Sequence, residues 1–222
     1  MRAGETLAEG YWLRADQQSG GRGRRGRGWT SPVGNLYCST VVRLGASDRP
    51  AHGLSFVTAL AVDDLLNQQL PAKTQGLPRL KWPNDVLVGG AKICGILLEQ
   101  VADCVIVGIG INVAHAPMLP DRTTTSIDQL GGVNGHSAQQ VLEQLAPLFA
   151  ARGAQWRADG LGAILSAWEA RAHPRGTPLV VTGDDGAPLT GIFAGLGADG
   201  SLRLRLDDGS ERAIHAADVS LI

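Results

Sequence analysis

Four arginines alternate with glycines in one short segment near the start of the sequence, Ser19–Trp29 (SGGRGRRGRGW). The arginines are Arg22, Arg24, Arg25 and Arg27. This density of glycine disfavours a regular helix or strand, so we expect a loop that is mobile without a ligand. No Asp or Glu lies between Asp16 and Asp48, although the whole chain has a formal charge of −1. Because a guanidinium engages two oxygens of an anion at once, the segment predicts binding of an anionic ligand, most simply a phosphate.

The segment Lys81-Trp-Pro-Asn-Asp85, with Lys92 seven residues after Asp85, is the second candidate site. Pro83 restricts the residue before it to an extended backbone, and Asn84-Asp85 favours a turn. A cation, an aromatic ring and a carboxylate therefore lie together at a strand end, which suits a nucleotide with its phosphates and Mg²⁺. An ordinary turn with a half-buried tryptophan, and a Lys92 that only caps a strand, remain open.

Gly108-Ile-Gly-Ile-Asn112 places two glycines on one face of an apolar strand. The third glycine of a dinucleotide-binding fingerprint is missing, and the pair lies inside the strand, so that fold is disfavoured. Glycines in a strand leave room for a close approach to the backbone. Either a ligand lies across the strand, with the Asn112 amide at its rim, or a neighbouring element packs there.

The sequence contains no G-x-S-x-G, no Walker A motif and no plausible Ser-His-Asp set. Its three cysteines, Cys38, Cys94 and Cys104, stand singly in apolar runs, which predicts buried thiols and neither disulfides nor metal ligands. The five histidines are scattered along the chain. This fits a reaction in which both reacting groups come from substrates and the protein supplies position and charge.

Composition narrows the class of protein. With 222 residues, 44% hydrophobic and 18% charged, the chain can build a sizeable core. It has no apolar run near the ~18 residues of a membrane helix and no signal peptide, so we expect a cytoplasmic protein without a membrane partner. The lack of a basic excess argues against a dedicated nucleic-acid-binding protein.

Hydrophobic periodicity and turn residues predict the elements that position these segments. The expected strands are Tyr11–Ala15, Leu36–Leu44, Asp85–Val88, Lys92–Val101 and Cys104–Val113, the last three joined by tight turns at Gly89-Gly90 and Ala102-Asp103. The expected helices are Leu54–Leu70, Ser137–Arg152 with Ser137 as N-cap, and Leu161–Ala172, with connections at Pro71–Pro78 and Ala114–Gly135.

The pattern of expected elements changes from long helices to short strands near Pro174. Short strands are expected at Thr177–Thr182, Leu189–Leu196, Ser201–Leu206, Glu211–Ile214 and Val219–Ile222, with Asp-Gly turns between several of them. Such regular spacing predicts a small all-β barrel. We therefore expect a main domain over 1–173 and a small domain over 174–222.

Taken together, Gln18–Trp29, Lys81–Asp85, Lys92–Glu99 and Gly108–Asn112 closely resemble the biotin–protein ligases, the biotin–[acetyl-CoA-carboxylase] ligases of bacteria. The resemblance runs from about Tyr11 to the C-terminus. It implies an α+β fold, with a mixed β-sheet flanked by helices of the class II synthetase type and an SH3-like C-terminal barrel. It also implies a catalytic biotin/lipoate ligase-like domain before Pro174.

The resemblance implies a reaction in two steps. Biotin and ATP, with Mg²⁺, give biotinyl-5′-AMP and pyrophosphate, and the biotinyl group then passes to a lysine of the biotin carboxyl carrier protein of acetyl-CoA carboxylase. Lys92, Arg24 and Asp85 would be catalytic, with Lys92 neutralising the α-phosphate.

The other roles are also carried over from the resemblance. Gln18, Arg22, Gly23 and Arg24 would contact biotin or the adenylate, and Asp85 with Asn84 would hold Mg²⁺-ATP or orient the lysines. Arg27, Trp29 and Asn112 would lie nearer the nucleotide. Among the arginines we expect Arg24 to matter most and Arg25 least, as the one that points to solvent.

Two departures from the family pattern stand out. An Asp-Ser-Thr-Asn-like turn, which lines the biotin pocket in the family, is not found before Tyr11, so we expect that the start was assigned too far downstream. No helix-turn-helix precedes the loop, so the chain resembles the monofunctional ligases, and a monomer or weak homodimer is expected.

Two rival functions remain. Lipoate ligation or octanoyl transfer uses a related fold and similar carboxylate chemistry, but those proteins do not carry this Gly-Arg loop. An RNA-binding Arg-Gly module predicts aromatic residues between the arginines or a broad basic face. Trp29 alone meets that condition.

Overall fold

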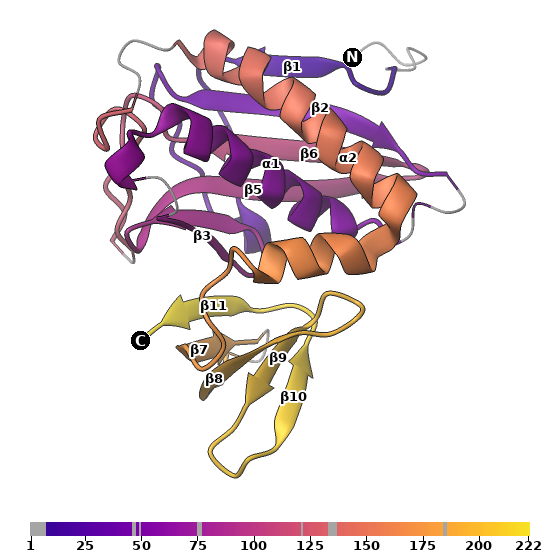
Figure 1. Ribbon diagram of the computed structural model, residues 1–222. Coiled ribbons are helices and arrows are strands. Elements are labelled where there is room, and N and C mark those ends of the chain that lie inside the picture. The colour runs from indigo at the N-terminus through magenta and orange to yellow at the C-terminus, as the bar shows by residue number, and fades with distance from the viewer. Residues whose placement is uncertain are drawn as a thin grey trace.

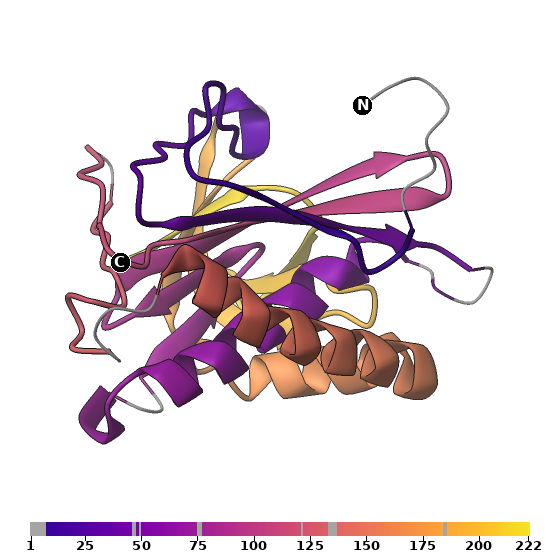
Figure 2. The same cartoon turned by 90° about the horizontal axis from the view of Figure 1, so that it is seen from above.

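The computed structural model describes residues 8–45, 48, 50–74, 77–120, 122–132, 137–183 and 186–222. Its larger part is a six-stranded sheet in the order β1-β2-β6-β5-β4-β3, with both helices on one face (Figures 1 and 2). The strands are β1 (Trp12–Ala15), β2 (Leu36–Arg43), β3 (Pro78–Lys81), β4 (Asp85–Val88), β5 (Ala91–Val101) and β6 (Cys104–Ile111). These ladders are antiparallel, and among the described residues parallel pairing is limited to isolated bridges such as Lys92 with Thr124. The expected α+β class is confirmed.

Helix α1 (Gly53–Gln69) is buried along most of its length between the sheet and helix α2 (Ala138–Glu169). The predicted N-cap is confirmed, because the Ser137 hydroxyl accepts from the Gln140 N–H and the Gln140 side chain accepts from the Ser137 N–H. The predicted end at Arg152 is wrong. Helical turns continue until Gly160, whose φ of 77° breaks the helix. The residues of this extension are mostly good helix formers, and Trp156 within it is buried.

Strand β3 was not predicted, since its residues were assigned to a connection and a strand end. It forms the edge of the sheet and pairs with β4, and Pro78 at its first residue is a position where proline is tolerated. The predicted tight turns between β4, β5 and β6 are confirmed, with positive φ at Gly89, Gly90 and Ala102.

The C-terminal region forms a second sheet with the antiparallel order β10-β9-β8-β7-β11. Its strands are β7 (Pro178–Thr182), β8 (Pro188–Leu196), β9 (Leu202–Arg205), β10 (Glu211–Ile214) and β11 (Asp218–Leu221). The five expected strands are confirmed. Closure into a barrel is wrong for the described residues, because the edge strands β10 and β11 have only 4 residues each and do not pair with each other.

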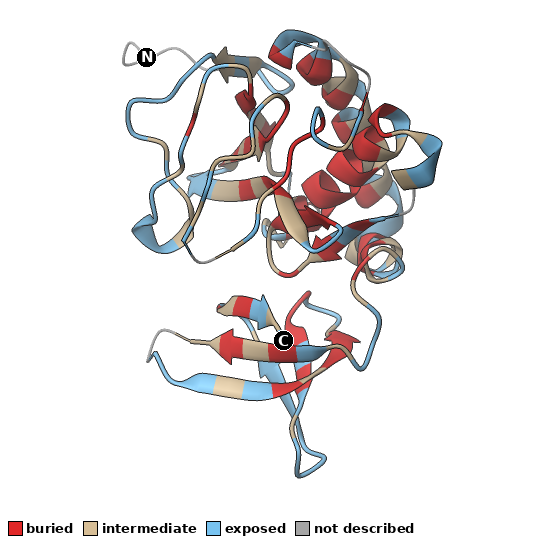
Figure 3. Cartoon of the chain, turned by 90° about the vertical axis from the view of Figure 1, so that its left-hand side faces the viewer, coloured by how far each residue is buried: buried red, intermediate tan, exposed pale blue. Residues whose placement is uncertain are grey.

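One hydrophobic cluster runs through both sheets, and buried residues line their junction (Figure 3). Trp82, in the turn between β3 and β4, donates from Nε1 to the Gly200 carbonyl oxygen at 3.0 Å. Phe56 of α1 meets Trp168 of α2 edge-on at 5.6 Å between ring centroids. The C-terminal sheet is therefore packed firmly against the end of the larger sheet. No helix in the described ranges has the length and apolarity to cross a bilayer.

Candidate active site

A cavity of about 440 Å³ lies between the Arg-Gly loop (Gly20–Gly28) and the face of the large sheet that the helices leave open. The predicted site residues that line it are Gln18, Arg22, Gly23, Arg24, Arg27, Trp29, Asn84, Asp85 and Lys92. These residues are far apart in the sequence, and the fold brings them together. Asn112 and Lys81 do not line this cavity.

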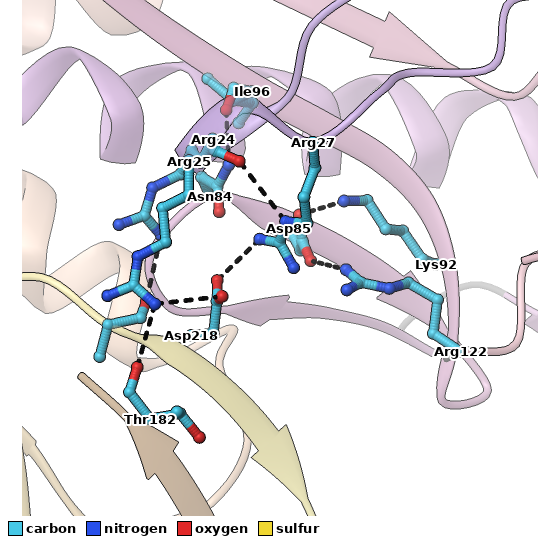
Figure 4. Close-up of polar contacts among 11 residues, drawn as sticks. Arg24, Arg25, Arg27, Asn84, Asp85, Lys92, Ile96, Arg122, Thr182 and Asp218 are labelled. Carbon is cyan, nitrogen blue, oxygen red and sulfur yellow. Dashed lines mark hydrogen bonds and ion pairs between the residues drawn. The ribbon is translucent and has the colours of Figure 1, made fainter. Parts of the chain in front are cut away.

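Asp85 is held between two cations on the sheet side of the cavity, which we call its floor (Figure 4). The Lys92 Nζ donates to Asp85 Oδ1 at 2.5 Å, and Arg122 Nη1 lies 3.7 Å from Asp85 Oδ2. The side chains of Asp85 and Lys92 are only 10% and 12% exposed. Charges so poorly solvated interact strongly, so the carboxylate fixes the direction of both cations.

Backbone pairing fixes Lys92 from the other side. Its N–H donates to the Thr123 carbonyl oxygen and its carbonyl oxygen accepts from the Thr125 N–H, both at 2.9 Å. Arg122 enters the site through this pairing. Sequence reasoning missed Arg122 because it lies in a loop with no periodic pattern, and only the bridge beside Lys92 brings it to Asp85.

Asn112 supports this arrangement from within the protein. Its side chain is buried, and its Nδ2 donates to the Thr125 carbonyl oxygen at 3.0 Å. The interpretation of Asn112 as an amide at the rim of the ligand is thereby corrected. The amide instead ties the end of β6 to the segment that holds Lys92, because a buried amide must satisfy its hydrogen bonds locally.

Trp29 is the group that approaches the backbone glycines of the sheet. Gly95 and Gly110 are cross-strand partners on β5 and β6. A Cβ at Gly110 would lie 2.5 Å from Trp29 Cζ2, and one at Gly95 would lie 2.8 Å from Trp29 Cζ3. Lys92 Nζ lies 5.3 Å from the centroid of the Trp29 ring, within range of a cation–π interaction. The absence of side chains at Gly95 and Gly110 therefore allows Trp29 to pack against the sheet, next to the ammonium group of Lys92.

The Arg-Gly loop is closed by backbone hydrogen bonds within it. A single 3₁₀ turn spans Arg24–Gly26 (η1), and the Gly23 N–H donates to the Arg27 carbonyl oxygen at 2.7 Å. The Trp29 N–H donates to the Gly21 carbonyl oxygen at 2.9 Å. The expectation that the segment holds no regular helix or strand agrees with this geometry, because the single turn contains Arg25 in a left-handed conformation and Arg22 pairs with Gly28 only through an isolated bridge.

Three loop arginines contact the C-terminal sheet. Arg24 Nη1 donates to the Ala217 carbonyl oxygen at 3.3 Å, and Arg27 Nη2 donates to Asp218 Oδ1 at 2.7 Å. Arg25 Nη1 donates to Asp218 Oδ2 and to the Thr182 carbonyl oxygen, both at 3.2 Å. The expectation that Arg25 points to solvent is wrong, because β11 lies directly beneath the loop (Figure 4).

Burial lowers the pKa of Arg24, the neighbouring Arg25 and Arg27 act in the same direction, and Asp218 and Asp85 oppose the shift. An arginine remains charged at neutral pH even so. A cation that has lost part of its hydration interacts more strongly with an incoming anion. The geometry thus places desolvated positive charge on the loop side of the cavity and the Asp85–Lys92–Arg122 cluster on its floor.

The donor set fits a resident magnesium ion poorly. Mg²⁺ prefers carboxylate and water oxygens in an octahedral arrangement, whereas both oxygens of Asp85 face cations. Within the described part of the chain, no three His, Cys, Asp or Glu side chains are grouped as metal ligands would be. Of the two roles implied for Asp85, orienting the cations agrees with the geometry, and ligation of a metal does not.

Comparison with known proteins identifies the relatives of this chain. The model of the biotin/lipoate A/B protein ligase family matches residues 6–112, and that of the biotin protein ligase C-terminal domain matches residues 180–222. The biotin–[acetyl-CoA-carboxylase] ligase of Paracoccus denitrificans is 40% identical, covering 99% of this chain and 93% of that protein. The Mycobacterium tuberculosis ligase of the same name is 34% identical, covering 94% and 77%.

A solved structure agrees with the sequence relatives. The biotin protein ligase from Aquifex aeolicus in complex with biotin and ATP superimposes with a TM-score of 0.82 at 26% identity. The match covers 99% of this chain and 91% of that one. The likeness therefore extends over both sheets.

Proposed function

The chain belongs to the biotin/lipoate A/B protein ligase family. We propose that it works as an ATP-dependent biotin–protein ligase and that the reaction takes place in the cavity beneath the Arg-Gly loop. The observation that carries the proposal is a cavity lined by cations from two sides, with Lys92 fixed by Asp85 and the loop arginines above it. Such a cavity stabilises negative charge on a phosphate without contributing a nucleophile.

In the first step a carboxylate oxygen of biotin attacks the α-phosphorus of ATP. A new P–O bond to the biotinyl group forms, the bond to the bridging oxygen breaks, and pyrophosphate leaves. Negative charge builds on the α-phosphate oxygens, where we assign Lys92 as the donor from the floor and Arg24 and Arg27 as donors from the loop. Because Asp85 holds Lys92 before ATP arrives, little reorganisation is needed when the charge develops.

In the second step a carrier lysine attacks the acyl carbon of biotinyl-5′-AMP. The amine loses a proton, an amide bond forms, and AMP leaves. We propose the biotin carboxyl carrier subunit of acetyl-CoA carboxylase as the protein that supplies this lysine, as the names of the Paracoccus and Mycobacterium relatives imply. A loop closed over the mixed anhydride keeps water away until that lysine enters.

We assign Gln18 and Asn84 to ligand orientation at two edges of the cavity. The Gln18 N–H donates to Ser31 Oγ at 3.0 Å, which fixes the start of the loop while the side chain faces the cavity. The Asn84 Nδ2 donates to the Ile96 carbonyl oxygen at 2.6 Å. Gln18 bonds to Ser31 through its main chain, and Asn84 uses its side-chain NH₂ toward Ile96. The side-chain amide of Gln18 and the amide oxygen of Asn84 therefore supply hydrogen-bonding capacity for a ligand.

The test is biotin-dependent exchange of labelled pyrophosphate into ATP, with lipoate and octanoate as parallel substrates. We expect exchange with biotin and none above background with the other two acids. Exchange with lipoate or octanoate but not with biotin would overturn the substrate assignment. Transfer of biotin to a carrier domain, and not to the same domain with its acceptor lysine changed to arginine, would test the second step.

An RNA-binding role for the Arg-Gly loop is disfavoured by where its arginines point. Arg24 and Arg27 line the cavity, and Arg25 is bonded to the C-terminal sheet. RNA binding of this kind needs cations and aromatic rings displayed together on an open surface. We propose that phosphate groups of the nucleotide are the anions that this loop binds.

A further inference from the structure

Asp218, the first residue of β11, joins the Arg-Gly loop to the C-terminal sheet. Its two carboxylate oxygens are shared between two arginines: Oδ2 with Arg25 at 3.2 Å and Oδ1 with Arg27 at 2.7 Å. Main-chain carbonyl oxygens on either side bind the same loop, from Ala217 to Arg24 and from Thr182 to Arg25 (Figure 4). The start of β11 and the end of the neighbouring β7 therefore contact three arginines of the loop.

The three arginines are not equivalent. Arg24 and Arg27 line the cavity, whereas Arg25 does not. Arg25 has a φ of 55°, in the left-handed region that a residue with a side chain rarely adopts. Such a conformation persists where the surroundings over-determine it, and the bonds from Arg25 to Asp218 and Thr182 supply that constraint. The loop is thus held on the C-terminal sheet at Arg25, a contact that we call the pin, and Arg24 and Arg27, which precede and follow Arg25, line the cavity.

Charge repulsion makes this pin necessary. Arg25 and Arg27 each act on Arg24 as repelling charges, while Asp218 acts as the largest attractive one. When the loop closes over the cavity without a ligand, several like charges are brought together, which disfavours the closed position. A carboxylate between Arg25 and Arg27 offsets that repulsion before any phosphate has bound.

We propose that Asp218 is a positioning residue for adenylation: it holds the Arg-Gly loop on the C-terminal sheet so that Arg24 and Arg27 face the nucleotide phosphate. Through this contact the C-terminal sheet sets how tightly ATP and the adenylate are retained. The kinetic part of the inference rests on the proposed ligase function. The structural part concerns the free protein and does not depend on that function.

Three variants of the full chain test the structural part. Asp218→Asn removes the charge, Asp218→Glu keeps it, and Asp207→Asn removes one charge from the exposed turn between β9 and β10 of the same sheet. In limited digestion of the free protein by trypsin, we expect Asp218→Asn to be cut at Arg22–Arg27 about three- to tenfold faster, the effect of losing partly exposed ion pairs. Asp218→Glu should restore part of the protection, and Asp207→Asn should match the unmodified protein.

Thermal unfolding of each variant shows whether the effect is confined to the loop. We expect Asp218→Asn to unfold at nearly the same temperature as the control Asp207→Asn. Faster cutting of the loop at an unchanged unfolding temperature supports the proposal. Equal cutting of Asp218→Asn and Asp207→Asn overturns it.

The kinetic part is tested by pyrophosphate exchange with biotin. For Asp218→Asn we expect the KM for ATP to rise about three- to tenfold, while kcat at saturating ATP changes by less than about twofold. A lower KM would mean that Asp218 competes with phosphate for the arginines, and it would overturn the positioning role. If the unmodified protein shows no biotin-dependent exchange, the ligase proposal fails, and the trypsin comparison still decides whether Asp218 holds the loop.

Discussion

Two carboxylates in this protein each lie between two cations, and they are built differently. Asp85 is 10% exposed, and its partners Lys92 and Arg122 are fixed by strand pairing. Asp218 is 34% exposed, and its partners Arg25 and Arg27 belong to a loop from another part of the chain. The comparison teaches that the same ion-pair chemistry can fix a charge within a buried part of a site and hold a more exposed loop above it.

Solvent exposure is the physical reason for the difference. Breaking a buried ion pair from one side leaves an uncompensated charge and typically costs about 3–5 kcal/mol. Exposed ion pairs contribute about 0–1 kcal/mol, since water competes for both partners. We therefore expect the Asp85 cluster to respond to substitution with large losses of catalysis, and the Asp218 cluster with smaller changes in ligand retention.

The largest effect should come from Lys92→Ala. Removing the floor cation lowers the adenylation rate by about 10²–10³-fold, the scale of losing one donor to a developing oxyanion. Pyrophosphate exchange measures this loss, and thermal unfolding measures the cost of leaving Asp85 with Arg122 alone. Lys92→Arg should not restore the rate, because a planar guanidinium replaces a compact ammonium. If Lys92→Ala had a lower unfolding temperature but near-normal turnover, Lys92 would only cap the strand and would have no catalytic role.

Gly110→Ala is next in size. A Cβ there would lie 2.5 Å from Trp29, so the indole must move away from Lys92. A displacement on this scale lowers the adenylation rate by about 10- to 100-fold. The matched control is Gly108→Ala on the same face of β6, whose Cβ would meet its nearest atom, the Leu97 carbonyl oxygen, at an ordinary 3.5 Å. Equal effects of the two substitutions would contradict the assignment of Gly110 to Trp29.

A double-mutant cycle sharpens the account of the loop cluster. Arg25→Ala and Asp218→Asn each remove the same pin, so their combined effect on trypsin sensitivity should be less than additive. We expect a coupling energy of about 0.5–1 kcal/mol between them. Additive effects would show that Arg25 holds the loop independently of Asp218. Biotin plus ATP should suppress cutting at Arg22–Arg27 in the unmodified protein, because a bound phosphate adds a second anion to the cluster.

The smallest effect concerns pH at the junction of the two sheets. Burial lowers the pKa of His173 below its usual 6.5, and Arg79 and Lys81 act in the same direction. The folded state then binds this proton less readily than the unfolded chain, so the stabilisation is complete above pH 6.5 and is lost as the pH falls toward the lower folded pKa. Unfolding measured between about pH 8 and pH 5 should show a shallower loss of stability for His173→Gln. If the stability of His173→Gln and of the unmodified protein fell equally steeply with pH, His173 would not be responsible for the pH dependence.

The sequence predicted the floor of the site better than its loop side. Lys92, Asp85 and Asn84 lie on a strand and at a turn whose hydrophobic and turn-forming residues are local signals. Their meeting follows from antiparallel pairing of consecutive strands. Of the predicted glycine pair, Gly110 does mark a close approach to β6, and the structure identifies Trp29 as the group that approaches. Gly108 has only ordinary contacts within the sheet.

The residues of the loop that line the cavity were predicted, but the contacts of the loop with the C-terminal sheet could not be, because they depend on how the two sheets pack. Asp218 lies 191 residues from Arg27, and nothing in a short exposed strand marks one carboxylate as the partner of a distant arginine. Arg122 was missed for a related reason, since its loop has no periodicity. That β10 and β11 do not pair with each other also depends on tertiary packing, whereas the short apolar runs and Asp-Gly turns that predict these strands are features of the local sequence.

Single-turnover formation and release of biotinyl-5′-AMP tests most directly the claim that the floor drives catalysis and the loop retains the product. With saturating ATP and biotin, Lys92→Ala should form the adenylate about 10²–10³-fold more slowly. Asp218→Asn should form it within about twofold of the normal rate and release it about three- to tenfold faster. If Asp218→Asn slowed formation as much as Lys92→Ala and left release unchanged, the division between a fixed floor and a retaining loop would be contradicted.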